Sequence, residues 1–469
     1  MQRATTISAF RDRLNRRIDP SSLIAFRICY GVLVAIGAIR FLAEGWVDAF
    51  FVKPTFFFTF DFAPWVRVGP EWLMTSAVVT VAVLGVLVAC GLFYRVSIVA
   101  LVVIFSYLEL TDVTNYLNHY YQLIALGVLL CFMPLGRAGS VDAKRNPAKA
   151  VMEARGWMID LLRFQVGVVY VFAAVAKLNT DWLIHAQPLN IWLLSRTDTP
   201  LIGSMLGSFD MALFMSWVGF LHDLLIVPAL CWRRSRVLAY GVLVGFHIGT
   251  GLLFNIGMFP LIMILTTPIY FADDWPKRVM RRWRKRIPSN RSDAGQGLPV
   301  VKPLGRWGMI AVLAWCLIQV AVPARTFAYS GSTNWHEQGM RFSWRVMCRQ
   351  KRGSVTYRVT TDGRSRERLV FPNKYLTAAQ EREMAGQPDL VLQLAHHIGA
   401  DFKARGYTGV QVRVDALVSL NGRRPSRLID PAVDLMTVKV SFLTSADWIL
   451  PAPEDGPIRL EPQTHKAGK

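Results

Sequence analysis

The sequence predicts an α-helical polytopic membrane protein of about nine spans with a C-terminal α+β exoplasmic domain. Hydrophobic residues make up 53% of the 469 residues, and several apolar runs approach the length that crosses a bilayer. After about residue 323 the apolar runs stop and short alternating segments begin. We therefore assign residues 1–323 to a transmembrane helical domain and residues 324–469 to an exoplasmic α+β domain.

The net charge of +21 is typical either of a nucleic-acid-binding protein or of a membrane protein with basic loops. Many basic residues gather in short clusters between the apolar runs, and the densest cluster lies at 277–286. This placement favours membrane orientation, and we expect no nucleic-acid partner. Five of the six cysteines lie in or at the ends of apolar segments, so we expect no disulfide framework and no metal site.

The expected spans follow from the apolar runs and from the positive-inside bias. Basic residues between positions 3 and 17 place the N-terminus in the cytoplasm, and we expect no cleaved signal peptide. An odd number of spans then leaves the C-terminal domain outside. Several spans are short, so re-entrant or tilted segments stay open. The expected spans are 21–43, 71–92, 96–111, 119–135, 157–178, 211–231, 237–254, 257–271 and 307–322.

The C-terminal domain shows strand and helix patterns in turn. Residues 354–361 partly alternate and can pair with 368–371 across a hairpin turn at Asp362-Gly363. Residues 377–405 have a helix-forming composition that ends at Gly406. A further strand at 411–419 precedes a turn at Asn421-Gly422. The one segment with the composition of a linker is 288–297, ahead of the last span.

Lys177 is the residue that most needs an explanation, because it ends the apolar run that begins near Trp157. Burying an ammonium group in hydrocarbon costs roughly several kcal/mol unless water or a partner group compensates for the lost hydration. One interpretation is an anchor whose charge reaches the membrane interface. The other is a chemical base, because burial disfavours the ammonium form and makes a neutral amine available. Position alone leaves both open.

Two histidines are expected near the same face of the membrane as Lys177. His119 begins the fourth span beside Asn118 and Tyr120, and His247 lies partway along the seventh. A lysine and a histidine at similar depth form a candidate proton-transfer site. Each histidine taken alone is more often a polar packing residue, and we interpret the pair His222-Asp223 in the same way.

Other polar and aromatic residues in the spans have structural interpretations. Asp160 and Arg163 lie three residues apart on one expected helix, a spacing that predicts a salt bridge. Four tryptophans are candidates for substrate contacts or for an interfacial aromatic belt. They are Trp182, Trp192, Trp335 and Trp344.

Several segments resemble the vitamin K-dependent γ-glutamyl carboxylases and their bacterial relatives with a horizontally transferred transmembrane (HTTM) domain. The resemblance covers most of the chain, and its most specific segments are VAKLNTDW and FNIGMFP. The remaining segments are IDPSSLIAFR, GLFYRVS, NYLNHYYQ, RFSW and LIDPAVDL.

This resemblance implies an enzyme in which a lysine deprotonates reduced vitamin K, here a hydroquinone of the menaquinol type. Oxygenation of the hydroquinone to the epoxide then drives removal of a γ-proton from glutamate, and CO2 adds to the carbon. O2 and CO2 are thus the co-substrates, and a glutamate-containing peptide or protein is the acceptor. Lys177 is similar to the family's base and His119 to an assisting histidine. Ala176 departs from the animal pattern, in which a second lysine stands before the base.

The resemblance to bacterial members of the family implies a bacterial plasma membrane. It also implies a site around Lys177 and His119. The candidate substrate-binding residues are Asn118, Tyr120, His247, Trp182, Trp335 and Trp344. Two other functions stay open: an enzyme that oxidises or epoxidises a quinol without carboxylating glutamate, and a non-catalytic scaffold that binds membrane lipid.

Overall fold

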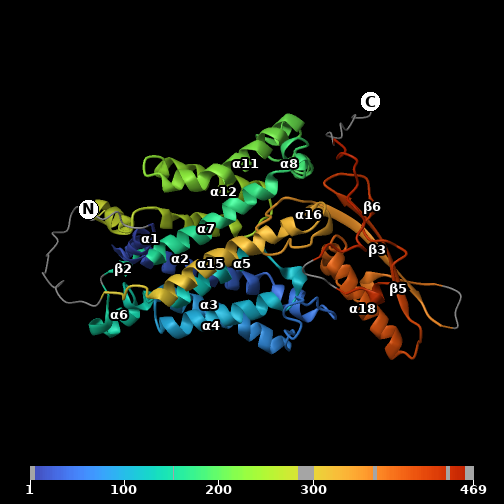
Figure 1. The fold of residues 1–469 in the computed structure, drawn as a ribbon, viewed down its shortest axis with the longest axis horizontal. Coiled ribbons are helices and arrows are strands. Elements are labelled where there is room, and N and C mark those ends of the chain that lie inside the picture. The colour runs from blue at the N-terminus through green and yellow to red at the C-terminus, as the bar shows by residue number, and fades with distance from the viewer. Residues whose placement is uncertain (1–5, 152, 284–299, 363–366, 440–443, 460–469) are drawn as a thin grey trace.

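The computed structural model describes residues 6–151, 153–283, 300–362, 367–439 and 444–459. A bundle of long helices fills one side of the molecule, and the C-terminal strands and α18 lie at the other side (Figure 1). The protein is thus mostly helical, with a small β region in its C-terminal part.

Among the described residues, six helical segments are long and apolar enough to cross a membrane, as predicted for six of the expected spans. The other three expected spans are shorter helices: α4 (Tyr94–Leu110), α5 (Asn118–Phe132), and the apolar segment Phe259–Tyr270, made of α13 (Phe259–Thr266) and η5 (Thr267–Tyr270). Nine helical runs therefore occur where nine were expected, but only six reach spanning length by themselves. The six long segments are α2 (Ser21–Ala43), α3 (Glu71–Cys90), α7 (Gly156–Lys177), α11 (Phe209–Cys231), α12 (Arg236–Leu253), and α15 (Arg306–Ala324) with the turn that extends it to Ala328.

Close contact between α2 and α3 depends on two glycines. A Cβ added to Gly31 would lie 2.5 Å from the backbone of Gly85, and one added to Gly85 would lie 2.8 Å from the backbone of Gly31. No larger side chain fits at either position without moving the helices apart. Small residues at helix contacts are a common feature of membrane bundles, because they allow close backbone approach.

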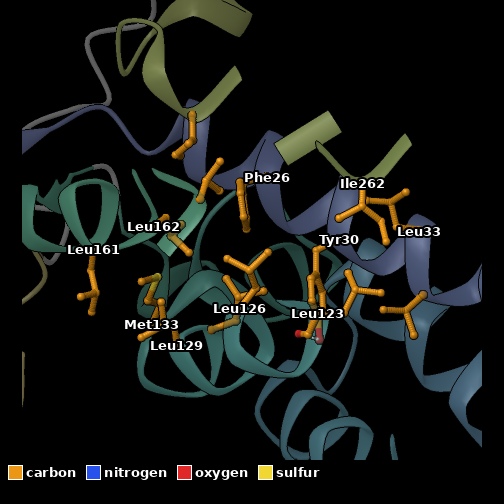
Figure 2. Close-up of a cluster of buried hydrophobic side chains, with 14 of the residues drawn as sticks. Phe26, Tyr30, Leu33, Leu123, Leu126, Leu129, Met133, Leu161, Leu162 and Ile262 are labelled. Atoms are coloured by element: carbon orange, nitrogen blue, oxygen red, sulfur yellow. Dashed lines mark hydrogen bonds between the residues drawn. The ribbon is translucent and has the colours of Figure 1, made fainter. Parts of the chain in front are cut away.

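The core of the bundle is a cluster of buried apolar side chains contributed by several helices (Figure 2). Tyr30 of α2 lies in this cluster and donates a hydrogen bond to the carbonyl of Leu123 on α5, at 3.1 Å. The cluster fixes α2, α5, α7 and α13 against one another. Its labelled members are Phe26, Tyr30, Leu33, Leu123, Leu126, Leu129, Met133, Leu161, Leu162 and Ile262.

The C-terminal region contains a four-stranded antiparallel sheet in the order β4-β3-β5-β6. Its strands are β3 (Lys351–Thr360), β4 (Arg368–Val370), β5 (Gln411–Leu420) and β6 (Ser426–Arg427). The expected pairing of β3 with β4 is confirmed, and β5 occurs where a further strand was predicted. The predicted turn residue Gly363 lies outside the described residues.

The turn at Asn421-Gly422 is also confirmed, because both residues have positive φ angles of 52° and 82°. Such angles are typical of the tight turns that join antiparallel strands. The range 377–405, predicted from its helix-forming composition, is helical over most of its length. It is broken into α17 (Ala378–Met384) and α18 (Pro388–Ala404), because Pro388 disfavours a helical conformation at the residue before it.

The connection between α2 and α3 packs onto the C-terminal core rather than lying free. The backbone of Thr59 exchanges two hydrogen bonds with the side chain of Gln393 in α18, at 3.1 and 3.0 Å. Phe58 and Phe60 of the same connection are buried in the core of the sheet region. These contacts hold the sheet region against one end of the helical bundle.

Short elements complete the described fold. The expected linker 288–297 lies outside the described residues. The short elements are α1 (Thr6–Asn15), α6 (Val141–Arg145), α8 (Thr180–Leu183), α9 (Leu189–Leu194), α10 (Gly203–Leu206), α14 (Trp275–Trp283), α16 (Thr333–His336), and the strand pair β1 (Arg17–Ile18) with β2 (Ala154–Arg155).

Candidate functional site

Lys177 is the last residue of α7, and the chain turns sharply after it. The side-chain amide of Asn179 donates to the carbonyl of Ala176 at 2.9 Å, and its oxygen accepts from the backbone N–H of Trp182 at 3.0 Å. Asn179 therefore ends α7 and begins α8. The turn brings Trp182 back over the lysine, with Nζ 5.1 Å from the centre of the indole ring.

The ammonium of Lys177 is buried and paired. Its Nζ lies 2.8 Å from Oδ2 of Asp223 on α11 and 3.3 Å from the carbonyl of Ala173. Both side chains are more than nine-tenths buried. The interpretation of Lys177 as an interfacial anchor is therefore wrong, because its charge is neutralised inside the bundle instead of reaching the surface.

Asp223 also connects Lys177 to a histidine. Oδ1 of Asp223 lies 3.1 Å from Nδ1 of His222, and the ring of His222 stacks on Phe246 with centroids 3.8 Å apart. The second ring nitrogen of His222 is buried without a hydrogen-bond partner among the described residues. Sequence analysis missed Asp223 as the partner of Lys177. Asp223 could have been found as a carboxylate within an apolar span, because a charge at such a position is expected to pair with an opposite charge.

Lys177 and Asp223 line a mostly apolar cavity of about 250 Å³. His247 and Tyr170 line the same cavity, and the hydroxyl of Tyr170 lies 2.8 Å from Nε2 of His247. The structure thus places Lys177 and His247 at one cavity, as the proton-transfer hypothesis requires. An apolar recess with a few convergent polar groups is the usual form of a small-molecule site.

His119 lies in a neighbouring cavity. It lines a recess of about 400 Å³ together with Asn118 and Tyr120. The ring of Phe259 stands between the two histidines, with its centroid 6.0 Å from His247 and 6.5 Å from His119. The structure therefore does not bring His119 into the cavity of Lys177. The two cavities share one wall, which consists of Ile256, Phe259, Val346 and Met347.

His119 and Tyr120 also line a third cavity of about 320 Å³, which contains the buried carboxyl group of Glu109. This carboxyl group accepts one hydrogen bond from the backbone N–H of Leu117, at 3.2 Å. Sequence analysis missed Glu109. Its signal was a single carboxylate near the end of an apolar run.

The chain matches two family models that together cover most of it. Residues 15–275 match the HTTM domain, and residues 305–455 match the lumenal domain of vitamin K-dependent γ-carboxylase. The chain belongs to the γ-carboxylase family with an HTTM domain. The resemblance noted in the sequence is confirmed. No solved structure matches the chain.

The tryptophans of this γ-carboxylase relative occupy different environments. Trp182 covers Lys177 and donates from Nε1 to the carbonyl of Ser216 at 2.8 Å. Trp335 is buried in the C-terminal core and donates to the carbonyl of Leu450, whereas Trp344 is buried and stacks on Tyr121. Trp182 thus lines the cavity of Lys177, while Trp335 and Trp344 lie in packed cores.

The predicted pair of Asp160 and Arg163 is confirmed at 3.6 Å, although both groups have closer partners. Asp160 lies 2.6 Å from Arg16, and Arg163 donates to the carbonyls of Ile269 and Phe271. This cluster ties α7 to its neighbours at the end opposite Lys177. It is a structural feature rather than part of the cavity.

A buried ion pair joins the site of this γ-carboxylase relative to the sheet. Asp181, next to Trp182, accepts two hydrogen bonds from the guanidinium of Arg423, at 2.7 and 2.6 Å. It also accepts from the side-chain amide of Asn421 at 2.9 Å. Sequence analysis could not find this contact, because Asp181 and Arg423 lie 242 residues apart. The predicted turn at Asn421-Gly422 is therefore the point where the sheet touches the segment that covers Lys177.

Proposed function

We propose that this protein is a quinol-dependent carboxylase-like enzyme in which Lys177 is the base. The observation that carries the proposal is the buried Lys177–Asp223 pair at the wall of an apolar cavity. A reduced vitamin K of the menaquinol type fits such a site, because it reaches the cavity from the bilayer and presents an acidic hydroxyl to the amine. When bound, the hydroquinone supplies this proton and, with O2, the oxidation that drives carboxylation of glutamate by CO2.

The polar groups of the cavity can hold and move the proton. As a base, Lys177 must be neutral before it receives the hydroquinone proton. Asp223, at 2.8 Å from Nζ, can take the lysine proton in advance and pass it to His222, and its restored carboxylate then stabilises the ammonium that forms afterwards. His222 on the other oxygen of Asp223 extends the route by one more titratable group. Trp182 adds the face of an indole ring, which favours a cation above it.

His247 and Tyr170 have a positioning role in this proposal. Their hydrogen bond of 2.8 Å fixes the imidazole at the cavity that Lys177 also lines, where a ring hydroxyl of the hydroquinone can accept or donate a hydrogen bond. We assign His119, with Asn118 and Tyr120, to the adjacent cavity. A ligand that spans the shared wall at Phe259 would contact both histidines.

A recess at the sheet region offers one cation to the carboxylate of a glutamate-containing acceptor. This recess of about 540 Å³ is lined by Arg325, Arg341 and His336, and also by the carboxylates of Asp61, Glu337 and Asp389. Arg341 pairs with Asp389, but the guanidinium of Arg325 meets only carbonyl oxygens among the described residues. Burial, with nearby Lys351 and Arg345, lowers the pKa of His336 to about 4, so this imidazole is neutral at pH 7. Arg325 is thus the cation that remains available to an acidic side chain.

The proposal includes a topology: nine spans in a bacterial plasma membrane, with the N-terminus in the cytoplasm and the sheet region outside. Single-cysteine labelling of intact cells tests it in a cysteine-free background. Lys374→Cys in the sheet region should react with an impermeant maleimide, and Lys149→Cys should react only after lysis. The reverse labelling pattern would show that the protein has the opposite orientation in the membrane.

The decisive experiment measures epoxide formation and incorporation of labelled CO2 in one reaction. Lys177→Ala should abolish both, while the protein still folds and inserts into the membrane. Lys53→Ala is the matched control, because Lys53 is exposed and does not line the cavity of Lys177. Near-normal epoxide formation in Lys177→Ala would overturn the proposal. Epoxide without CO2 incorporation in the wild type would instead indicate a quinol epoxidase, and neither product would indicate a lipid-binding scaffold.

A further inference from the structure

A basic recess lies at the end of the helical bundle away from the sheet. It has a volume of about 440 Å³ and lies between the start of α4, the end of α5 and the segment around α6. Figure 1 shows α6 at the same end of the bundle as α1, far from the C-terminal strands. Four cations line the recess: Arg95, Arg137, Arg145 and Lys149.

The positive charge of this recess is only partly balanced from within. Asp142 is the one carboxylate among its lining residues, and its oxygens accept backbone hydrogen bonds. Its two oxygens accept the backbone N–H groups of Phe93 and Tyr94, at 2.9 and 2.8 Å, at the start of α4. None of the four cations forms an ion pair within the described part of the chain. The recess therefore carries an excess of three positive charges that are available to an anion.

The walls of the recess are fixed by hydrogen bonds. Arg27 is buried beneath the segment 135–139 and donates to the carbonyls of Leu135, Ala138 and Gly139, at 2.7, 3.1 and 2.9 Å. Arg137 donates from Nε to the carbonyl of Lys149 at 2.8 Å. The recess is thus a built feature and not a chance meeting of long side chains.

An apolar rim adjoins the cations. Phe93, Val96 and Phe132 are each more than half exposed at this end of α4 and α5. The guanidinium of Arg145 lies 5.0 Å from the centre of the Phe93 ring. Exposed apolar side chains next to basic ones are typical of the boundary between hydrocarbon and headgroups.

We propose that this recess binds the phosphate headgroup of an anionic phospholipid, with the acyl chains along Phe93, Val96 and Phe132. The cations neutralise the phosphate, and the apolar rim accommodates the chains, so one lipid satisfies both halves of the feature. A free phosphate would be bound by the cations but would leave the apolar rim without a partner. The inference does not rest on the proposed enzymatic function.

The test compares lipids by native mass spectrometry and by thermal unfolding of the full chain in a neutral detergent. The probes are phosphatidylglycerol, phosphatidylcholine and inorganic phosphate. Phosphatidylglycerol should bind and raise the unfolding midpoint, whereas phosphatidylcholine and phosphate should not. A shift with inorganic phosphate equal to that with phosphatidylglycerol would overturn the assignment to a lipid.

The variant Arg145→Gln/Lys149→Gln should weaken binding of phosphatidylglycerol about 30-fold, since each cation near an anionic lipid contributes about fivefold. Neither side chain has a structural hydrogen bond in the described chain, so the fold should persist. Arg233→Gln/Arg234→Gln removes the same charge from another exposed cluster outside the recess and should bind like the wild type. Equal loss in both variants would overturn the site, because it would show general attraction to charge.

Discussion

In the described part of the chain the side chains of two lysines are buried, and they differ in what remains for chemistry. Lys177 in the helical bundle pairs with Asp223, and Lys351 in the sheet region pairs with Glu337 at 3.1 Å. Each also lies near a tryptophan ring, at 5.1 Å from Trp182 and 5.6 Å from Trp335. By burial and charge alone, the two sites look alike.

The difference lies in the third hydrogen of each ammonium group. Lys351 donates to Glu337 and to the carbonyls of Trp335 and Gly386, so its three N–H donors are all used. Lys177 donates to Asp223 and to the carbonyl of Ala173, and it lines a cavity with room for a ligand. Burial of a lysine therefore does not identify a base; an unused donor position at a cavity does.

Loss of the counter-ion of Lys177 should have the largest effect. Asp223→Asn should slow quinol turnover on the order of 10³-fold, because a charge pair about 4 Å apart is worth about 4 kcal/mol at an effective dielectric constant near 20. Steady-state epoxide formation measures the effect. Asp210→Asn, an exposed carboxylate on the same helix, is the control and should retain turnover. Equal turnover in the two variants would remove Asp223 from the site.

Loss of the other lysine should affect stability instead. Lys351→Met should lower the free energy of unfolding of the sheet region by about 3 kcal/mol, because Glu337 and two carbonyls lose a donor. Denaturant unfolding measures this change. Turnover per folded molecule should stay within about twofold of the wild type. A large loss of turnover in a fully folded Lys351→Met variant would contradict the assignment of a purely structural role to Lys351.

The ion pair between Asp181 and Arg423 tests whether the sheet helps to position the cover of Lys177. Arg423→Lys keeps the charge but loses the paired hydrogen bonds, and should slow turnover about tenfold, the scale of one hydrogen bond to a charged group. The neighbouring exposed residue supplies the control, Arg424→Lys. A reduced turnover with unchanged unfolding would support positioning, whereas unchanged turnover would limit the pair to a structural role.

The smallest expected effect, taken per pH unit, is a pH dependence of stability at Lys351. Burial lowers the pKa of Lys351 from an ordinary value of 10.5 to about 8, although the carboxylate of Glu337 acts to raise it. Between these two values the unfolded chain binds more protons, so stability should rise with pH by at most about 1.4 kcal/mol per unit. Below about pH 8 the destabilisation that comes from burying the charged lysine is fully present. Unfolding midpoints from pH 7.5 to 10.5 should show this rise in the wild type and not in Lys351→Met.

Sequence reasoning found features that are local in the chain. Lys177 was identifiable because a charge in an apolar run requires an explanation, and the turn at Asn421-Gly422 because its residue types tolerate positive φ angles. The spans were identifiable as apolar runs, but α5, at 15 residues, shows that run length does not fix helix length.

The partners of these features could not be predicted, because they depend on packing. Asp223 follows Lys177 by 46 residues, and its neighbour His222 suggested a local pair instead. Separation of His119 from the cavity of Lys177 depends on the ring of Phe259, which comes from another helix. A single sequence gives the depth of a residue in the membrane but not the side of the helix that it faces.

The central claim is that Lys177, and not simply a positive charge at its position, is required. The most direct test is the quinol turnover of Lys177→Arg, with thermal unfolding as the check on folding. A guanidinium can still pair with Asp223 but does not release its proton, so we expect a folded protein with no epoxide formation above background. Near-normal turnover in Lys177→Arg would contradict the account.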